Sequence, residues 1–313
     1  MIYITGGSGF LGSHIVKRLI DEGEEVRVLV RNRARAQREG RLAGLPLDWV
    51  DGDVTNPASL PEGLDGVDQI IHTAAIAIEK GQATYEEVNY QGTVNLIEAA
   101  RQTGVKRFVN ISQLGADPDL PYRFLASKGR AQAYVAQSGL DWTAFRPSVI
   151  WGPEDEFANT FARLVPITPI IFPIIGGEDA RFQPVWVEDV AAAAIGSLGD
   201  AATIGEEFEL GGPQVITLEE IERRVMKAID AKRIMVRFPM PVLRFAVKVM
   251  EATLPNPPVT SSLLELLQVE NVTSVNSLPR FVDSPRRFDP DYLATYMNDF
   301  TVARTLRSFM GRA

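Results

Sequence analysis

The feature that most restricts the fold of this chain is a glycine-rich turn near its first residue. Residues 2–5 form a short apolar run, and a helical pattern occupies residues 11–22. Glycines between a strand and a helix let the backbone turn tightly and let a pyrophosphate approach the amides at the helix N-terminus. The spacing predicts a dinucleotide-binding turn rather than a purely structural one. The expected ligand contacts are Gly6, Ser8, Gly9, Phe10, Leu11 and Gly12.

Further apolar runs alternate with helical patterns through the first half of the chain. Strands are predicted at 26–30, 47–50, 69–73, 107–112 and 142–146, and helices at 85–103 and 125–138. Strands separated by helices form right-handed crossovers around a buried parallel sheet. The sequence therefore predicts an α/β protein with a Rossmann-type, doubly wound parallel sheet.

The pattern changes after Pro147, where prolines interrupt the chain repeatedly. A helix at 185–198 and a strand at 206–210 look able to rejoin the sheet. We expect residues 1–152 to form the Rossmann domain and 183–212 to return to it. Residues 153–182 and 213–313 are expected to form a small α-rich C-terminal cap that binds a substrate or partner.

Composition excludes several classes of protein. The 313 residues carry a formal net charge of −8, which disfavours nucleic-acid binding because phosphates would be repelled. The chain has no cysteine and only two histidines, so we expect no disulfide and no metal site. The strand at residues 2–5 leaves no room for a signal peptide, and no apolar run is long enough for a transmembrane segment. We therefore expect a cytoplasmic protein, with peripheral membrane contact left open.

The end of the second strand favours a phosphorylated dinucleotide. NAD-binding Rossmann units place an acidic residue there to hold the ribose hydroxyls. This chain has Arg31 and Asn32, followed by Arg33, Arg35 and Arg38. Because arginine pairs with a 2′-phosphate whereas a carboxylate repels it, NADP(H) is preferred and NAD(H) is the alternative. A solvated basic helix start would explain the same arginines.

After the third strand, Asp53 and Val54 are candidates for the adenine side of the ligand. The Asp53 carboxylate would accept a hydrogen bond from the adenine amino group. An ordinary turn aspartate explains the position equally well.

Several further segments carry a family resemblance. In chain order, they are TGGSGFLG at 5–12, DGDV at 51–54, HTAA at 72–75, VNYQGT at 88–93, RPSVIWGP at 146–153, QPVWVEDVA at 183–191 and FELGGP at 208–213. Together they resemble the extended and atypical short-chain dehydrogenase/reductase superfamily. The segments LPNPPVT at 254–260 and ENV at 270–272 are similar to the branch that contains the NAD(P)-binding accessory subunit of respiratory complex I.

The resemblance implies roles for further residues. Lys128 would hold the ribose hydroxyls of the cofactor. After the fourth strand, Thr73, Ala74 and Ala75 would line the adenosine side. Ile111 and Ser112 would lie beside the nicotinamide ribose, and Pro147, Ser148 and Val149 beside the nicotinamide carboxamide.

The catalytic positions depart from the family pattern. Active members place a tyrosine four residues before the lysine, and its hydroxyl exchanges a proton with the substrate. Phe124 stands there in this chain and has no such proton. The usual Ser/Thr position holds Leu114. Ser112, Lys128 and the nearby Tyr122 are the remaining catalytic candidates, and a merely packed tyrosine is the alternative for Tyr122.

Residues 241–254 form a one-sided amphipathic helix, with Arg244, Lys248 and Glu251 on one side. Such a helix covers a core or else contacts a hydrophobic molecule, a protein partner or a membrane edge. Taken together, the sequence predicts an NADP(H)-binding protein with a degenerate tyrosine position and a structural, regulatory or sensor role. The alternative is an active oxidoreductase, epimerase or dehydratase for a small or lipophilic carbonyl or hydroxyl compound.

Overall fold

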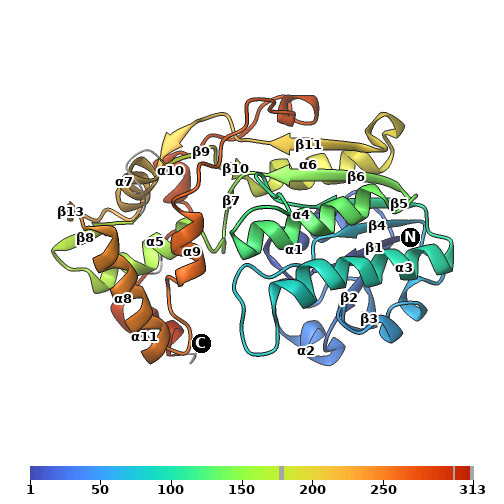
Figure 1. Cartoon of the computed structure of the whole chain (residues 1–313), viewed down its shortest axis with the longest axis horizontal. Helices are drawn as coiled ribbons and strands as arrows, with labels where there is room; N and C mark the ends of the chain where they lie inside the picture. Colours follow the sequence, from blue (N-terminus) through green and yellow to red (C-terminus); the bar gives the residue numbers. More distant parts are fainter. Residues whose placement is uncertain (176–179, 299, 311–313) are drawn as a thin grey trace. The chain divides into compact units, whose positions relative to one another are not determined.

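Seven parallel strands form the central sheet, in the order β11-β6-β5-β4-β1-β2-β3. In the computed structural model, which describes residues 1–175, 180–298 and 300–310, helices α1 and α6 pack on one face of this sheet and α3 and α4 on the other (Figure 1). The strands are β1 (Ile2–Thr5), β2 (Val26–Val30), β3 (Asp48–Asp51), β4 (Gln69–His72), β5 (Arg107–Ile111), β6 (Asp141–Pro147) and β11 (Glu206–Leu210). The helices are α1 (Phe10–Asp21), α2 (Arg33–Arg38), α3 (Gly92–Thr103), α4 (Arg123–Ala136) and α6 (Val187–Leu198). The predicted Rossmann-type fold is confirmed, and the strand order reverses between β1 and β4, where such sheets bind their ligands.

The chain divides into two compact units. Unit 1 contains this sheet and consists of residues 1–147, 187–210 and 274–285, whereas unit 2 consists of 148–186, 211–273 and 286–313. The segment 274–285, which we assigned to the cap, thus lies in unit 1. There the Ser277 amide donates to Glu209 O of β11, and the Phe281 ring packs edge-on against Phe145 at 5.2 Å.

Unit 2 is built from short strand pairs and helices. Strands β7 (Ile150–Trp151) and β10 (Val185–Trp186) pair in parallel, as do β8 (Ile171–Ile174) and β13 (Ile234–Arg237). Strands β9 (Arg181–Phe182) and β12 (Ile216–Thr217) pair antiparallel. The helices are α5 (Ala158–Leu164), α7 (Leu218–Ala228), α8 (Met240–Thr253), α9 (Ser261–Leu266), α10 (Pro290–Leu293) and α11 (Val302–Phe309).

The predicted helix at 85–103 is not uniform. Residues Glu86–Gln91 form a π-helical turn before α3 begins at Gly92. The side chain of Asn89 in this turn points inward, where Oδ1 accepts from the Ile76 amide at 2.8 Å and Nδ2 donates to Ile76 O at 3.1 Å. Such turns insert one residue into a helix and re-aim a side chain. Here the turn directs a buried amide onto the loop that follows β4.

Buried Arg107 ties the far side of the sheet together. Its guanidinium donates to Asp141 O, to Ser197 O and to the hydroxyls of Thr143 and Thr203. Burial lowers the pKa of the Arg107 side chain, but these acceptors compensate the charge. The strand pattern does not reveal this role, because the four acceptors come together only in the folded sheet.

A buried histidine joins the ends of β1 and β4 to α3. His72 Nδ1 lies 2.6 Å from Thr5 Oγ1, and Nε2 lies 2.9 Å from Thr93 Oγ1. Because Thr93 Oγ1 donates its own proton to Asn89 O, it accepts from Nε2–H, and Nδ1 accepts from Thr5. His72 is therefore neutral, and burial together with the nearby charge of Lys128 lowers its pKa to about 3.

We predict that His72 makes the fold sensitive to acid. As the pH falls from about 6.5 toward 3, the unfolded chain takes up a proton that folded His72 refuses, so the free energy of unfolding decreases. The loss attributable to this group is about 2 kcal/mol at pH 5. Denaturant titrations of the wild type and of His72→Gln across pH 5–7 measure it, with the variant losing the dependence.

If His72→Gln does not fold, NMR of the wild-type chain decides the question. The chain has two histidines, so their ring signals are few and separable. The His72 ring must remain neutral down to pH 5. A His72 signal that titrates near pH 6.5 would contradict the assignment.

Candidate functional site

The glycine turn is shaped by contacts that leave no room for side chains. Gly6 has a φ of +72°, and a Cβ there would lie 2.6 Å from the Ala74 amide. A Cβ on Gly12 would lie 2.3 Å from Gly6 O. In contrast, a Cβ on Gly9 would approach only Gly6 O, at 3.0 Å. The backbone at Gly9 is thus open to a ligand at the point where α1 begins.

The N-terminus of α1 offers unpaired donors to an anion. Gly9 precedes the helix and supplies no capping side chain, and the first turn contains no acidic residue. The first amides of a helix lack internal acceptors and carry the positive end of its dipole. The structure therefore presents Phe10 and Leu11, two of the predicted contacts, in a geometry suited to a pyrophosphate.

The end of β2 carries the predicted arginine. Arg31 is exposed and has no hydrogen bond or ion pair with any described residue. Asn32 accepts from the Arg35 amide at 2.9 Å and so caps α2, which gives it a structural task. Arg35 and Arg38 lie near Glu39 at 3.5 and 3.8 Å. Arg33 contributes only its amide, which donates to Asp51 at 2.8 Å, so the side chains of Arg31 and Arg33 are the two of this group without a bond to a described residue.

A second arginine near the turn was missed by the sequence analysis. Arg41 donates to Ser8 O at 3.4 Å and brings a positive charge to the glycine turn. The residue lies in the irregular segment between α2 and β3, where no periodic pattern indicates its direction. Only the fold places it beside Ser8.

Asp53 forms a turn of its own after β3. Its Oδ1 accepts from both the amide and the hydroxyl of Thr55, each at 2.9 Å. Val54 is buried against Gly92, and Asn95 Nδ2 donates to Val54 O at 2.8 Å. One oxygen of Asp53 is occupied in this way, while its proposed contact with adenine stays a prediction.

The segment after β4 lies directly on the glycine turn. Thr73 Oγ1 donates to Thr5 O at 2.8 Å, and the Thr73 amide donates to the same oxygen at 3.1 Å. These bonds hold residues 73–75 against Gly6, with Ala74 partly buried and Ala75 exposed. The glycine turn and the segment predicted to line the adenosine are therefore in contact within unit 1.

Lys128 is buried where β5 ends. Its Nζ donates to Ile111 O at 2.7 Å, and burial lowers its pKa to about 8. The adjacent Ser112 is buried too, and its Oγ has no hydrogen-bond partner among the described residues. The Lys128 ammonium has further N–H donors, and the Ser112 hydroxyl beside it has no described partner, so together they could hydrogen-bond the hydroxyl groups of a ribose. Lys128 and Ser112 would hold a nicotinamide ribose at this point.

The helix that carries Lys128 begins with the altered catalytic position. Phe124 lies one turn before Lys128 in α4, and its ring packs edge-on against Tyr85 at 5.6 Å. The Tyr85 hydroxyl donates to Ala77 O at 2.8 Å. Tyr122 precedes the helix with extended backbone and is partly buried. Leu114 is buried, and its amide donates to Pro147 O at 2.9 Å.

The predicted carboxamide segment spans the boundary between the units. Pro147 closes β6 in unit 1, whereas Ser148 and Val149 belong to unit 2. In unit 2, Ser148 Oγ donates to Asn271 Oδ1 at 2.6 Å and the Val149 amide donates to the same atom at 2.9 Å. Asn271 comes from the segment at 270–272 that carries part of the family resemblance. Its task within unit 2 is to anchor this segment.

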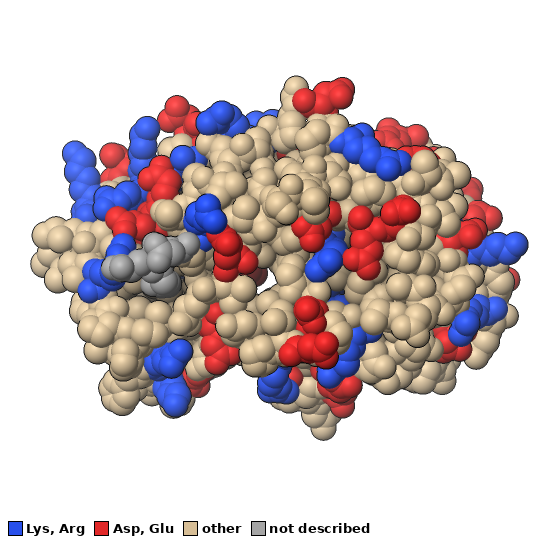
Figure 2. Space-filling view, turned by 45° about the horizontal axis from the view of Figure 1, so that its top comes forward, with Lys and Arg blue, Asp and Glu red and all other residues tan. Residues whose placement is uncertain are grey.

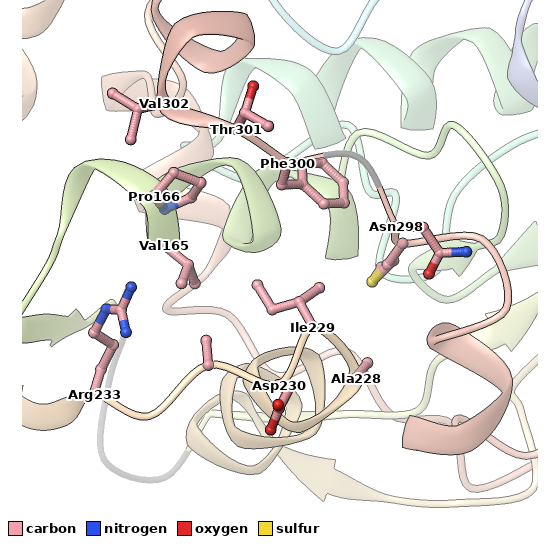
Figure 3. Close-up of a pocket in the computed structure, with 12 residues that line it drawn as sticks. Val165, Pro166, Ala228, Ile229, Asp230, Arg233, Asn298, Phe300, Thr301 and Val302 are labelled. Carbon is pink, nitrogen blue, oxygen red and sulfur yellow. The ribbon is translucent and has the colours of Figure 1, made fainter.

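Unit 2 contains a cavity of about 600 Å³ between the end of α7 and the start of α11 (Figure 3). Val165, Pro166, Ile229 and Phe300 give it apolar walls. The Arg233 guanidinium, at one edge of the cavity, donates to Thr168 O at 2.7 Å and to Lys232 O at 3.0 Å. The described lining residues include no nucleophile paired with a base.

Two buried carboxyl groups in unit 2 have raised pKa values. Asp155 accepts from the amides of Gly152, Phe157 and Asn159, and burial raises its pKa to about 6. Glu222 accepts from the Ile175 amide at 3.0 Å, and burial raises its pKa to about 8. Within the described part of the chain, no cluster of His, Asp or Glu is arranged to hold a metal ion. We therefore assign both carboxyl groups to the local fold.

Comparison with known proteins agrees with this geometry. A family profile described as NAD(P)H-binding matches residues 6–164. The mitochondrial NADH dehydrogenase (ubiquinone) 1 alpha subcomplex subunit 9 of Arabidopsis thaliana is 28% identical over 289 residues, which cover 88% of this chain and 68% of that protein. A 3 beta-hydroxysteroid dehydrogenase/Delta 5-->4-isomerase of Mycobacterium tuberculosis (strain CDC 1551 / Oshkosh) is 30% identical, with 78% of this chain and 73% of that protein covered.

Among solved structures, the UDP-glucose 4-epimerase of Thermus thermophilus, determined with NAD, has the same fold. It aligns with a TM-score of 0.68 at 22% identity and covers 95% of this chain and 97% of its own. The glycine turn on β1, the buried Lys128 in α4 and the profile match lead to one conclusion. This chain belongs to the extended short-chain dehydrogenase/reductase family and binds a nicotinamide dinucleotide.

Proposed function

We propose that the chain binds NADP(H) as a retained cofactor with a structural or regulatory role, rather than turning it over. The observation that carries this proposal is Phe124, which stands one helical turn before buried Lys128. The lysine that would hold the ribose is present, while the group that would exchange a proton with a substrate is absent at the position of Phe124. A phenyl ring contributes packing against Tyr85 and no acid–base chemistry.

The preference for NADP(H) is supported by charge at the adenosine end. Arg31 has no partner among the described residues, and Arg41 adds a second positive charge over Ser8. The acidic side chain at the end of the adjacent strand, Asp51, accepts from the Arg33 amide at 2.8 Å. An arginine fork matches the oxygens of a 2′-phosphate, whereas NAD(H) has only hydroxyls to offer.

The role without turnover is supported by one of the relatives. The plant protein is named as a subunit of NADH dehydrogenase, so a chain of this family serves in an assembly. We propose the same kind of role here, with the dinucleotide stabilising the fold of unit 1.

A second candidate function is oxidation or reduction of a lipophilic hydroxyl or carbonyl compound. The mycobacterial relative is named for 3β-hydroxysteroids, and the buried Ser112 hydroxyl has no partner among the described residues. Ser112, Tyr122 or water would then supply the proton that Phe124 cannot.

We predict that Arg31→Ala weakens NADPH binding tenfold or more and changes NADH affinity less than twofold. A tenfold loss corresponds to about 1.4 kcal/mol, close to the lower end of the range for a hydrogen bond to a charged group. Arg35→Ala is the matched control, because Arg35 lies near Glu39 and should leave both affinities unchanged. Titration calorimetry of nucleotide-free protein measures the NADPH and NADH affinities of the wild type and of both variants. Equal losses for both nucleotides would refute the assignment of the 2′-phosphate to Arg31.

We predict that Lys128→Met makes the ligand-free protein more stable at pH 7 while weakening NADPH binding. The pKa of Lys128 falls from 10.5 to about 8 on folding, so its buried charge costs stability below pH 8 and the cost fades as the pH rises toward 10.5. Allowing for the lost bond to Ile111, the gain is about 1–3 kcal/mol. Denaturant unfolding and NADPH titration measure the two effects.

Lys106→Met, on the surface, is the control and should change neither property. If Lys128→Met binds NADPH as tightly as the wild type, Lys128 has no part in holding the ribose.

We predict that gently purified protein releases NADP(H) on denaturation, as identified by mass spectrometry. The bound nucleotide should exchange slowly, and adding a 3β-hydroxysteroid should leave the nicotinamide absorbance unchanged. Phe124→Tyr should bind NADPH with nearly the wild-type affinity, because the ring position is kept. Fast exchange with steroid-dependent reduction of the nucleotide in the wild type would favour the second candidate.

A further inference from the structure

Unit 2 leaves an unusually apolar surface uncovered at one end. The largest exposed fractions belong to Phe245 at 70%, Ile170 at 67% and Ile234 at 63%. We call the following set the cap face: Ile170, Ile171, Ile234, Phe238, Val242, Phe245, Val249, Val302, Leu306 and Met310. Soluble chains rarely expose apolar side chains in such groups unless something binds there.

Helix α8 contributes most to the cap face. Only Leu243 and Val247 are buried among its 14 residues. Val242, Phe245 and Val249 follow one another at helical spacing and are exposed. The helix therefore does not simply cover a core, which was one of the two expectations for this segment. Packing against unit 2 buries Leu243 and Val247, whereas three large apolar side chains of the same helix face solvent.

The other members of the cap face adjoin α8 in the structure. Ile171 and Ile234 are neighbours in the β8–β13 pair, and β13 runs through Phe238 directly into α8. The Asn256 amide, just after α8, donates to Phe309 O at the end of α11 at 3.0 Å. Figure 1 shows β8, β13, α8 and α11 at the same end of unit 2. The elements that carry the exposed residues are therefore gathered at one end of unit 2.

The charge around the cap face is opposite to that of the whole chain. Residues 232–253 and 301–310 contain seven Lys and Arg and one carboxylate, whereas the chain has 32 basic and 40 acidic residues. The carboxylate, Glu251, accepts from the Ser261 amide and hydroxyl, and the basic Arg237 pairs with Glu219. Elsewhere basic and acidic side chains are interspersed, as Figure 2 shows for one face.

We propose that the cap face docks on the surface of an anionic lipid bilayer. Helix α8, about 21 Å long, would lie parallel to the membrane, with Phe245 and its apolar neighbours among the headgroups and acyl ends. Arg244 and Lys248 would meet the lipid phosphates, because basic side chains near an anionic membrane are drawn to it. No described helix has the length and apolar composition needed to cross a bilayer, so the contact is peripheral.

The composition of the cap face favours lipid over a protein partner. Protein interfaces are enriched in Tyr, Trp, Phe, Met and Arg and depleted in Lys. The cap face contains no Tyr or Trp, seven of its ten residues are Ile, Val or Leu, and Lys248 lies beside it on α8. A lipid surface also needs no specific shape. The cavity of Figure 3 shares Val302 with the cap face, so lipid contact would reach its rim.

Vesicle flotation of the full chain tests the proposal. The protein should float with vesicles of phosphatidylcholine mixed with phosphatidylglycerol, remain unbound with phosphatidylcholine alone, and detach at high salt. Phe245→Asp should reduce binding tenfold or more. Val275→Asp is the matched control, because Val275 is 66% exposed but lies in unit 1, and it should bind as the wild type does.

Charge reversal gives a second, independent arm. Lys248→Glu should reduce binding to anionic vesicles several-fold, while Lys17→Glu, an exposed residue of α1 with the same change in net charge, should have no more effect than that net charge alone. Circular dichroism and the content of bound nucleotide show whether each variant is folded and retains its cofactor. A variant that keeps both but no longer binds vesicles has lost lipid binding alone.

Several outcomes would overturn the proposal. Wild-type protein that ignores anionic vesicles rules out lipid docking. Binding that survives both Phe245→Asp and Lys248→Glu places the contact elsewhere. A lipid-free dimer in light scattering that Phe245→Asp dissociates would assign the cap face to a second copy of the chain.

Discussion

The close contact between the glycine turn and the segment after β4 is the constraint on which the rest of unit 1 depends. Gly6 lies against the backbone of Thr73 and Ala74, while Gly12 lies against Gly6 O. No side chain fits at either place, so α1 can start only where it does, and β1 and β4 must be neighbours. The same crowding exposes the first amides of α1 at the point where the strand order reverses. Packing and anion binding thus have a common origin.

Three basic side chains inside unit 1 show how the fold uses buried polarity. His72 is neutral and joins Thr5 to Thr93, so burial costs it little. Arg107 keeps its charge because main-chain and threonine oxygens surround it. Lys128 has one described acceptor, Ile111 O, and is the least compensated of the three. A buried charge with unused hydrogen-bond donors destabilises a folded protein, and such groups are found at sites where a bound ligand supplies the missing acceptors.

Much of the fold and part of the candidate site could be predicted from the sequence. Strands buried on both faces have continuous apolar runs, so the boundaries of β1 and β2 were visible in the sequence itself. Phe124 and Arg31 were identified because each replaces a residue type whose chemistry the cofactor site requires. The roles of Arg41 and Tyr85 were not predictable, because each depends on a contact between segments separated by a loop without periodicity. The position of 274–285 in unit 1 was not predictable for a similar reason, because its contacts are with residues distant in the sequence, such as Glu209 in β11 and Phe145 in β6.

Local chemistry therefore determined the class of this protein. A glycine has no side chain, the arginine at the end of β2 carries a positive charge, and Phe124 lacks a hydroxyl. Each of these properties belongs to the residue and its neighbours in the chain, so it can be seen in the sequence. Tertiary structure alone decided the energetic state of the groups. It buried Lys128 beside the Ser112 hydroxyl, which has no partner among the described residues, made His72 neutral, and left Phe245 and its neighbours on α8 exposed. Burial depends on the packing of distant segments, and an amphipathic pattern has the same appearance whether or not another segment covers it.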